Sequence, residues 1–297
     1  MKKRIGRDWA AFNAIGHVYL TLFTLICVIP FIMIISGSLT ESSHITRHGY
    51  SILPGRLSTA AYRTFFNSPE AILYGYRVTL IVTAAGTLCG LILTSMTSYV
   101  LYRRDFKYRN KFAFYLYFTT LFSGGLVPLY IIMTKYLQLK NTYLALILPN
   151  MMSVFYILIM RNFMSASIHD SLVESAKIDG ASDFYVYRMI IMPLLKPALA
   201  CIGLFMGVQY WNDWSSSMLY ITREYMFSLQ YRLYRILTAA DALREMMGAV
   251  PDEMLKDMPT ETTKLAMTVV SVGPIVLAYP FVQKYFVGGI MVGAVKG

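Results

Sequence analysis

Residues 15–39 read IGHVYLTLFTLICVIPFIMIISGSL and contain no Asp, Glu, Lys or Arg. A helix needs about 20 mainly apolar residues to cross the hydrocarbon core of a bilayer, so this run is long enough to span it. The basic start, Met1-Lys-Lys-Arg4, resembles that of a signal peptide. The apolar run is too long for such a peptide, however, and it lacks an A-x-A-like cleavage site. We therefore expect it to remain as the first membrane span.

Five further apolar segments follow along the chain. The expected spans lie near residues 14–38, 77–101, 112–136, 141–161, 197–220 and 265–286. Composition agrees, because 56% of the 297 residues are hydrophobic and only 14% are charged, whereas soluble domains carry about 25% charged residues. The sequence predicts an all-α, polytopic protein of the cell membrane with about six transmembrane helices. We expect a short N-terminal tail, 1–13, and a transmembrane domain, 14–297.

The distribution of Lys and Arg sets the expected orientation. With the N-terminus in the cytoplasm, six crossings leave residues 1–13, 102–111, 162–196 and 287–297 inside. These segments and the adjoining helix ends hold fifteen basic and six acidic residues, against twelve basic and ten acidic residues in the rest of the chain. Because short cytoplasmic loops are enriched in Lys and Arg, we expect both termini to be cytoplasmic. The same placement accounts for the net charge of +11 without a nucleic acid partner.

Two segments on the expected outer side are longer than simple turns. They cover residues 40–76 and 221–264, whereas most connections are only a handful of residues long. Such segments serve either as spacers or as surfaces that receive a partner. Residues 240–258 mix Ala, Leu and Met with charged residues, so we expect this part to be partly helical.

The longest inside segment, residues 168–197, carries the most informative pattern. Its centre reads ESAKIDGASDFYVYRMIIMP from Glu174 to Pro193. We expect a short helix with Asp170 or Ser171 as its N-cap, then a turn with positive φ at Gly180 and a second short helix. By shape alone, such a segment fits equally well an amphipathic element lying in the membrane interface.

The spacing within this segment resembles the EAA loop of binding-protein-dependent importer permeases. That pattern is E-A-A, three residues, G, nine residues and I-x-L-P. The matching positions here are Glu174, Ala176, Gly180, Ile190 and Pro193, and the run Asp179-Gly180-Ala181 is also typical of the family. The departures are Ser175 and Met192, where the pattern has Ala and Leu.

The resemblance extends over most of the chain and points to the carbohydrate-uptake group. LFSGGLVP at 121–128, LPN at 148–150 and YFVGGIMVGAVKG at 285–297 look like the maltose-permease-like branch. This resemblance implies a type I ABC importer permease fold and ATP-driven uptake of an oligosaccharide or polysaccharide fragment by alternating access. It also implies a second, unlike permease chain, two cytoplasmic ATPase subunits and an extracytoplasmic solute-binding protein.

Within this family, the EAA-type loop (168–197) is the part that couples the permease to its ATPase. The resemblance therefore marks Glu174, Ala176, Asp179, Gly180, Ala181 and Pro193 as candidate coupling residues. The chain has no G-x-x-x-x-G-K-[ST] loop to cradle phosphates, so ATP and Mg are expected on the partner ATPase subunits. No catalytic signature occurs, and the three cysteines lie singly in apolar segments, so we expect neither an active site nor a metal site.

The fifth expected span holds the densest group of polar and aromatic residues. The candidate substrate-path residues are Gln209, Tyr210, Trp211, Asn212, Asp213 and Trp214. Polar groups inside a membrane usually face a cavity or a partner helix, and aromatic faces beside amide groups suit sugars. Equally, the three aromatic rings fit an interfacial belt. Asp213 either pairs with an Arg or lines the path.

Other functions stay open at this point. The chain is alternatively an ABC permease for a peptide or an amino acid, a membrane scaffold or an intramembrane enzyme. The missing catalytic signature argues against an enzyme, and the EAA spacing argues against a scaffold. The sequence does not specify the sugar, its length or its charge.

Overall fold

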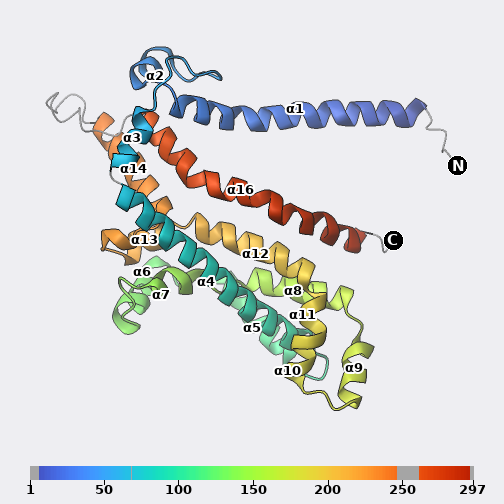
Figure 1. The fold of residues 1–297 in the computed structure, drawn as a ribbon. Helices are drawn as coiled ribbons and strands as arrows, with labels where there is room; N and C mark the ends of the chain where they lie inside the picture. The colour runs from blue at the N-terminus through green and yellow to red at the C-terminus, as the bar shows by residue number, and fades with distance from the viewer. Residues whose placement is uncertain (1–6, 68, 246–260, 295–297) are drawn as a thin grey trace. The chain divides into compact units, whose positions relative to one another are not determined.

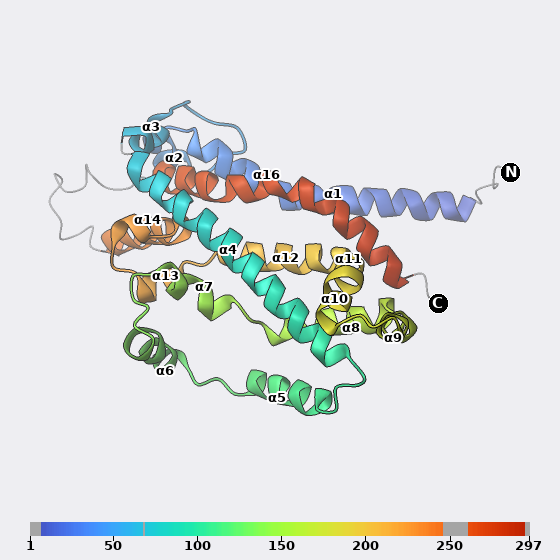
Figure 2. The ribbon, with the colours of Figure 1, turned by 60° about the horizontal axis from the view of Figure 1, so that its bottom comes forward.

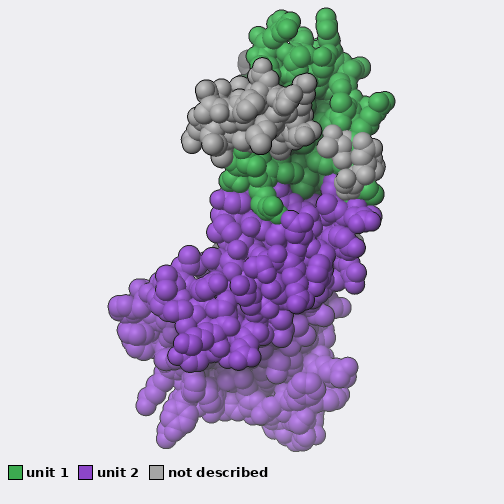
Figure 3. Space-filling view, turned by 90° about the vertical axis from the view of Figure 1, so that its left-hand side faces the viewer, with its two compact units in different colours: residues 1–69, 235–273 green, residues 70–234, 274–297 purple. Residues whose placement is uncertain are grey.

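The computed structural model describes residues 7–67, 69–245 and 261–294, and its regular elements are helices (Figure 1). In this part of the chain, one isolated bridge between Thr40 and Leu57 is the exception. The chain divides into two compact units, drawn in green and purple in Figure 3. Unit 1 comprises Met1–Pro69 and Arg235–Gly273, and unit 2 comprises Glu70–Tyr234 and Pro274–Gly297. The expected all-α class is confirmed.

Unit 1 contains the first expected span as a continuous helix. Helix α1 (Arg7–Ser38) is 32 residues long and includes Pro30. Its stretch Phe12–Ser38 is long and apolar enough to cross a membrane, and none of its most apolar part is buried. A helix that is apolar all round is stable only inside a membrane or a protein core. The described part of the expected tail, residues 7–13, is thus helical and continuous with the span.

The first expected outer segment folds into two short helices in unit 1. Helix α2 (Ser42–His48) ends at Gly49, whose φ is 77°, and α3 (Ala60–Asn67) follows. The hydroxyl of Tyr50 donates a hydrogen bond to the carboxylate of Glu261 at 2.9 Å. The ammonium of Lys264 lies 3.2 Å from the same carboxylate. These bonds hold the loop after α2 to the first turn of α16 (Glu261–Ala294).

The second expected outer segment begins in unit 2 with the short turn η4 (Glu224–Met226). Helix α14 (Leu229–Glu245) follows and continues into unit 1. The helix expected within residues 240–258 is therefore present up to Glu245. Residues 246–258 lie outside the described residues.

Unit 2 is built around α4 (Pro69–Tyr102), a second straight candidate span. Small residues on α4 let another helix approach closely. A Cβ added at Gly86 would lie only 2.5 Å from the ring of Tyr210, which belongs to α12 (Lys196–Trp211). Glycine at this position is therefore what allows the two helices to pack.

The third expected span is sharply bent. Helix α5 (Arg109–Leu121) is joined to α6 (Leu126–Ile131) and the π-helical turn η1 (Ile132–Tyr136) at an angle of 110°. Figure 2 shows the extended link between α5 and α6. The reason lies in the break: Phe122 is extended, Gly125 has φ 85°, and Pro128 has no backbone N–H to offer a preceding turn.

The fourth and fifth expected spans are also broken. Helix α7 (Tyr143–Ile147) and the 3₁₀ turn η2 (Leu148–Asn150) meet α8 (Val154–Ser167) at 54°. The fifth is bent by 80° between Asp183–Leu194 and α12, which ends at Trp211. Helix α13 (Ser215–Tyr220) continues after a turn. By length and composition, the described residues contain two straight candidate spans and three bent ones. Helix α16 covers the range expected for the sixth.

The main core of unit 2 packs α4 and α8 against the segment that leads into α12. Its buried side chains are Tyr99, Tyr102, Met160, Met164, Ile168, Val186, Tyr187, Ile191, Leu195, Ala198, Ile202 and Met206. Several of them belong to the EAA-type loop, so this loop is part of the core and not a surface excursion.

Candidate functional site

The EAA-type loop folds as the expected helix, turn and second helix. Helix α9 (Asp170–Ile178) leads to Gly180, and α10 (Asp183–Tyr185) continues as the π-helical turn η3 (Val186–Ile191) and α11 (Met192–Leu194). The hydroxyl of Ser182 caps the second helix by accepting a bond from the Tyr185 amide. The expected N-cap was wrong. His169 holds that position without a side-chain bond, because the Asp170 carboxylate is bound elsewhere.

Gly180 ends α9 with a Schellman-type turn. Its φ is 82°, a region that residues with a Cβ rarely adopt. The Gly180 amide donates to the carbonyl of Lys177 at 3.0 Å, and the Ala181 amide donates to the carbonyl of Ala176 at 2.9 Å. These are the two bonds of the Schellman motif. Three of the candidate coupling residues, Ala176, Gly180 and Ala181, therefore build one turn.

Four charged side chains form a closed ring across this turn. The Arg103 guanidinium donates to Asp105, with Nε 2.7 Å from Oδ1, and also pairs with Asp183. The Lys177 ammonium donates to Asp105 Oδ2 at 2.6 Å and lies 3.5 Å from Asp183 Oδ1. Each cation thus contacts both anions. We call these four residues the charge ring.

The charge ring joins three segments of unit 2. Arg103 and Asp105 follow the end of α4, Lys177 lies in the last turn of α9, and Asp183 begins α10. Hydrogen bonds from Arg103 and then from Lys177 hold the pKa of Asp105 well below its usual value. The bond to Asp105 likewise raises the pKa of Lys177. The ring is therefore fully charged at neutral pH.

A second tether holds the other end of α9. The Asp170 carboxylate pairs with Arg104 at 2.8 Å and accepts a bond from the Tyr102 hydroxyl at 3.2 Å. The same hydroxyl lies 3.2 Å from the carbonyl of Ile168. Helix α9 is thus attached to the carboxyl end of α4 at its first residue and in its last turn.

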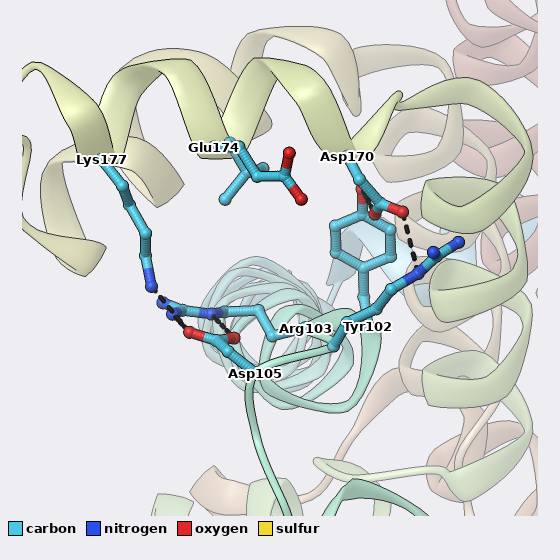
Figure 4. Close-up of a pocket in the computed structure, with 8 residues that line it drawn as sticks. Tyr102, Arg103, Asp105, Asp170, Glu174 and Lys177 are labelled. Carbon is cyan, nitrogen blue, oxygen red and sulfur yellow. Dashed lines mark hydrogen bonds and ion pairs between the residues drawn. The ribbon is translucent and has the colours of Figure 1, made fainter.

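Glu174 lies between the two tethers. Figure 4 shows Asp170, Glu174 and Lys177 projecting from the same face of α9 toward the end of α4. They line a cavity of about 120 Å³ together with Tyr102 and Arg103. Among the described residues, Glu174 makes no hydrogen bond or ion pair, and its side chain is exposed. Its carboxylate is available to a group from outside the chain.

The second helix of the loop is anchored inside the core. The hydroxyls of Tyr187 and Ser95 lie 2.7 Å apart and are both buried. Ile191 is fully buried, and Ile190 packs against the same core. Pro193 lies in the short helix α11, which follows η3 without a break. Asp179, the last candidate coupling residue, is the exposed C-cap of α9.

The candidate substrate-path residues are divided between a polar network and the interior. Gln209 donates to the Asn150 side chain at 3.1 Å, and Asn150 donates to Asp213 at 3.0 Å. Asp213 also accepts bonds from the Ser215 hydroxyl at 2.9 Å and from the Ser216 amide at 3.0 Å. Asp213 is therefore tied to amide and hydroxyl groups, and no Arg pairs with it among the described residues.

Two of the three aromatic residues in this group are buried. Tyr210 is 2% exposed and donates to the carbonyl of Ile147 at 2.8 Å. Trp211 is 6% exposed and lines an apolar cavity of about 550 Å³ beside Gly203 and Gly207. Trp214, in contrast, is 37% exposed and stacks on Tyr234, with the ring centres 4.1 Å apart. Next to it, exposed Asn212 accepts a bond from Gln230 at 3.2 Å.

Sequence reasoning missed most of the contacts that position these groups. Arg103, Arg104 and Asp105 were used only in the count of basic and acidic residues on the inside segments. Asp183 was used in the same count and otherwise only as part of the motif region. The run Tyr102-Arg-Arg-Asp105 directly after a span was the available signal, but it does not identify partners about 70 or 80 residues further along the chain. Asn150 was noted only as part of the LPN stretch at 148–150, and Gln230 and Tyr234 gave no signal beyond their residue types.

Comparisons with known proteins agree with this architecture. Residues 10–291 match the family described as the inner membrane component of binding-protein-dependent transport systems. The chain is 36% identical over 286 residues to the polygalacturonan/rhamnogalacturonan transport system permease protein YtcP of Bacillus subtilis (strain 168), covering 96% of this chain and 98% of that one. It is 27% identical to the arabinooligosaccharides permease AraQ of Halalkalibacterium halodurans, over the full length of both chains.

A solved structure agrees as well. The chain resembles a subunit in the crystal structure of a bacterial ABC transporter involved in the import of the acidic polysaccharide alginate. The TM-score is 0.79 with 28% sequence identity, and the match covers 95% of this chain and 98% of that one. The chain therefore belongs to the family of inner membrane components of binding-protein-dependent transport systems, and it is a multi-pass permease subunit of an ABC importer.

Proposed function

We propose that this permease imports an oligosaccharide or a polysaccharide fragment, using ATP hydrolysed on separate subunits. The observation that carries the proposal is the EAA-type loop. Its two short helices are joined at Gly180 and attached to α4 at several points, while Glu174 has no partner among the described residues. A rigid element of this kind can receive a soluble ATPase and follow its movement as a body.

The substrate class is supported by the relatives. The proteins most similar to this chain include permeases named for polygalacturonan/rhamnogalacturonan and for arabinooligosaccharides, and the solved transporter is described as importing alginate. Polymers and oligomers of sugars are common to all three names. An oligosaccharide is accordingly the favoured substrate over a peptide or an amino acid.

The proposed assembly contains four further parts. They are a second, unlike permease chain, two cytoplasmic ATPase subunits that bind ATP and Mg, and an extracytoplasmic solute-binding protein. Family membership implies the ATPase and the binding protein.

The proposed orientation places both termini in the cytoplasm. The charge distribution supports this orientation, and two contacts agree with the grouping of segments on each side of the membrane. The loop after α4 and the EAA-type loop, both assigned to the inside, are joined by the charge ring. On the opposite side, Asn141 donates to the Thr222 hydroxyl at 2.9 Å and accepts from the Thr222 amide at 2.7 Å. Segments assigned to one side of the membrane are therefore in contact with each other.

Docking of the ATPase would use Glu174, Asp179 and the turn at Gly180. Glu174 is exposed over a small cavity and Asp179 is exposed at the C-cap, so both carboxylates can meet basic groups of a partner. Ala176, Ala181 and Pro193 shape the loop and are proposed to act through its conformation.

The proposed substrate path runs past Gln209, Asn212, Asp213 and Trp214. Exposed Trp214 offers an aromatic face, and the amides of Asn212 and Gln209 offer donors and acceptors for hydroxyl groups. Tyr210 and Trp211 are proposed to support this surface from behind, since both are buried.

Uptake in cells lacking this chain tests the substrate class. We expect the deletion strain to lose uptake of one group of labelled oligosaccharides, and the wild-type chain to restore it. Galacturonide oligomers, arabino-oligosaccharides and dipeptides should be compared, because they separate acidic from neutral sugars and sugars from peptides. Loss of dipeptide uptake with normal uptake of every oligosaccharide would contradict the proposal.

A further inference from the structure

The charge ring is organised differently from a set of independent surface ion pairs. Its charges alternate in sign, and each of the two cations contacts both carboxylates. The guanidinium of Arg103 is the least exposed member, at 11%, whereas Asp105 and Asp183 are 53% and 64% exposed. Arg is suited to this central place, because its planar fork bonds two acceptors in a fixed geometry.

The position of the charge ring in the chain is equally specific. Gly180 lies between Lys177 and Asp183, so the ring closes across the turn that joins the two helices of the EAA-type loop. A Cβ at Gly180 would contact nothing within 4 Å. No side chain packs against the backbone at Gly180 itself, so the ring adds a side-chain restraint between α9 and α10 to the backbone bonds of the turn.

Folding stability alone gives a weak reason for such a cluster. Ion pairs between exposed groups contribute about 0–1 kcal/mol each, and the two carboxylates of the ring are more than half exposed. The loop is also held independently by the Asp170 tether and by the buried Tyr187–Ser95 bond. The ring adds a restraint on the orientation of α9 relative to α10 and to the end of α4, because its members come from all three segments.

We infer that Arg103, Asp105, Lys177 and Asp183 are positioning residues that lock the EAA-type loop to the end of α4, so that a displacement of the loop is passed to α4 as a rigid-body movement. This inference rests on the proposed docking of the ATPase at the loop. It assigns no contact with nucleotide or sugar to the four residues. Their role is to keep α9, α10 and α4 in one arrangement while the loop is pushed or pulled.

The test uses the complete transporter in proteoliposomes, with its binding protein and an oligosaccharide that wild type transports. The variants are Lys177→Gln, Asp183→Asn and the double variant, all at exposed side chains. Lys107→Gln and Arg188→Gln are matched controls, because each removes an exposed charge from the same two segments without breaking a bond to a described residue. The measured quantity is oligosaccharide transported per ATP hydrolysed.

We expect each charge-ring variant to transport at least roughly five-fold less sugar per ATP hydrolysed than wild type. The ATPase subunits should still co-purify with it. The double variant should lose little more than the worse single variant, because the four residues act as a unit. Lys177→Arg, which keeps the charge, should retain most of the coupling.

Two results would overturn the inference. One is a transport-to-ATP ratio in the ring variants equal to that of Lys107→Gln. The other is loss of ATPase co-purification, which would make the ring a docking contact. Both results differ from a failure of the proposed function. If the proposed function were wrong, the wild-type chain itself would show no ATP-driven transport.

Discussion

The hydroxyl of Tyr187 lies 2.7 Å from the hydroxyl of Ser95 in the buried core of unit 2. Ser95 also donates to the carbonyl of Ile92 at 3.0 Å, so Tyr187 is the donor in the shared bond. Tyr187 belongs to the second helix of the EAA-type loop and Ser95 to α4. The loop and α4 are thus joined both by charges at the surface and by a hydrogen bond in the interior.

Replacing Tyr187 with Phe should therefore weaken the attachment without emptying the core. The aromatic ring at position 187 still fills its place in the core, and only one hydrogen bond is lost, which costs about 1 kcal/mol. We expect the melting temperature of the detergent-solubilised protein to fall by roughly 2–4 °C.

Tyr220→Phe is the control for this substitution. Tyr220 is also buried, but its hydroxyl has no hydrogen-bond partner in the described part of the chain. Removing that hydroxyl should leave the melting temperature unchanged or raise it. Equal losses in the two variants would show that the Tyr187–Ser95 bond contributes nothing specific.

Gly180→Val should disturb coupling more than folding. The φ of 82° at this position is unfavourable for any residue with a Cβ, at roughly 1–2 kcal/mol, and most unfavourable for a β-branched one. We expect the ratio of transport to ATP hydrolysis to fall, at a normal level of protein in the membrane. Asn tolerates positive φ better, so Gly180→Asn should lose less.

Gly124→Val is a suitable control for added bulk. Gly124 lacks a positive φ, and a Cβ there meets nothing within 4 Å. Normal transport by Gly180→Val would contradict the role of the turn. A loss in Gly124→Val as large as in Gly180→Val would point to a general effect of bulk.

The loop shows how far sequence reasoning reached. The helix, the Gly180 turn and the second helix were all predicted, because local backbone requirements determine them. The N-cap prediction failed because Asp170 is engaged by Tyr102 and Arg104, which belong to another part of the chain. A local pattern cannot reveal a competing partner that only tertiary folding supplies.

The spans show the same limit. Their number and approximate ranges followed from hydrophobicity, but their bends did not. The 110° bend at 122–125 depends on an extended Phe122 and a positive φ at Gly125. The break at 122–125 carries no charged residue, so the apolar run was read as one helix even though the backbone turns there.

The candidate substrate path was predicted as one group of six residues and is divided in the structure. Tyr210 and Trp211 are buried, whereas Trp214 is exposed. Residue type marked the group, but burial depends on which face of α12 meets α4. The partners Asn150 and Gln230 come from other segments, and sequence alone did not connect them.

Trp214→Ala should impair recognition of the sugar during transport. Trp214 presents part of its ring to the surroundings while it stacks on Tyr234, so its removal takes away an aromatic face and leaves the core intact. We expect a roughly ten-fold loss of transport at low substrate concentration, equivalent to about 1.4 kcal/mol. Trp214→Phe should keep most of the activity.

Trp9→Ala provides the comparison, since Trp9 is an exposed tryptophan on α1. It should leave the concentration dependence of transport unchanged. Equal effects of Trp9→Ala and Trp214→Ala would remove the argument for a sugar contact at Trp214.

The charge ring should be insensitive to pH across the physiological range. The pKa of Asp105 is lowered by its bonds to Arg103 and Lys177. Its contribution to the stability of the folded state is therefore present at pH values above the pKa of an unfolded Asp, and it is lost only as pH falls through the lowered pKa of the folded state. The pKa of Lys177 is raised by Asp105. Its contribution to stability is present at pH values below the pKa of an unfolded Lys, and it is lost only as pH rises through the raised pKa of the folded state.

Transport per ATP should therefore show a constant ratio between wild type and Lys177→Gln from about pH 6 to about pH 8.5. Taking the ratio removes any pH dependence of the ATPase subunits, which both forms share. A ratio that changes several-fold within this range would mean that a ring member titrates there, contrary to the geometry of the four bonded charges.

The most direct test of the central claim is ATP-driven transport by the reconstituted assembly. This chain, its partner permease, the ATPase subunits and the binding protein are placed in proteoliposomes with a labelled oligosaccharide. We expect sugar accumulation that requires ATP, that stops when this chain is omitted and that falls per ATP hydrolysed when Gly180 is replaced by Val. Accumulation that proceeds without ATP hydrolysis, or that is unaffected by omission of this chain, would contradict the account.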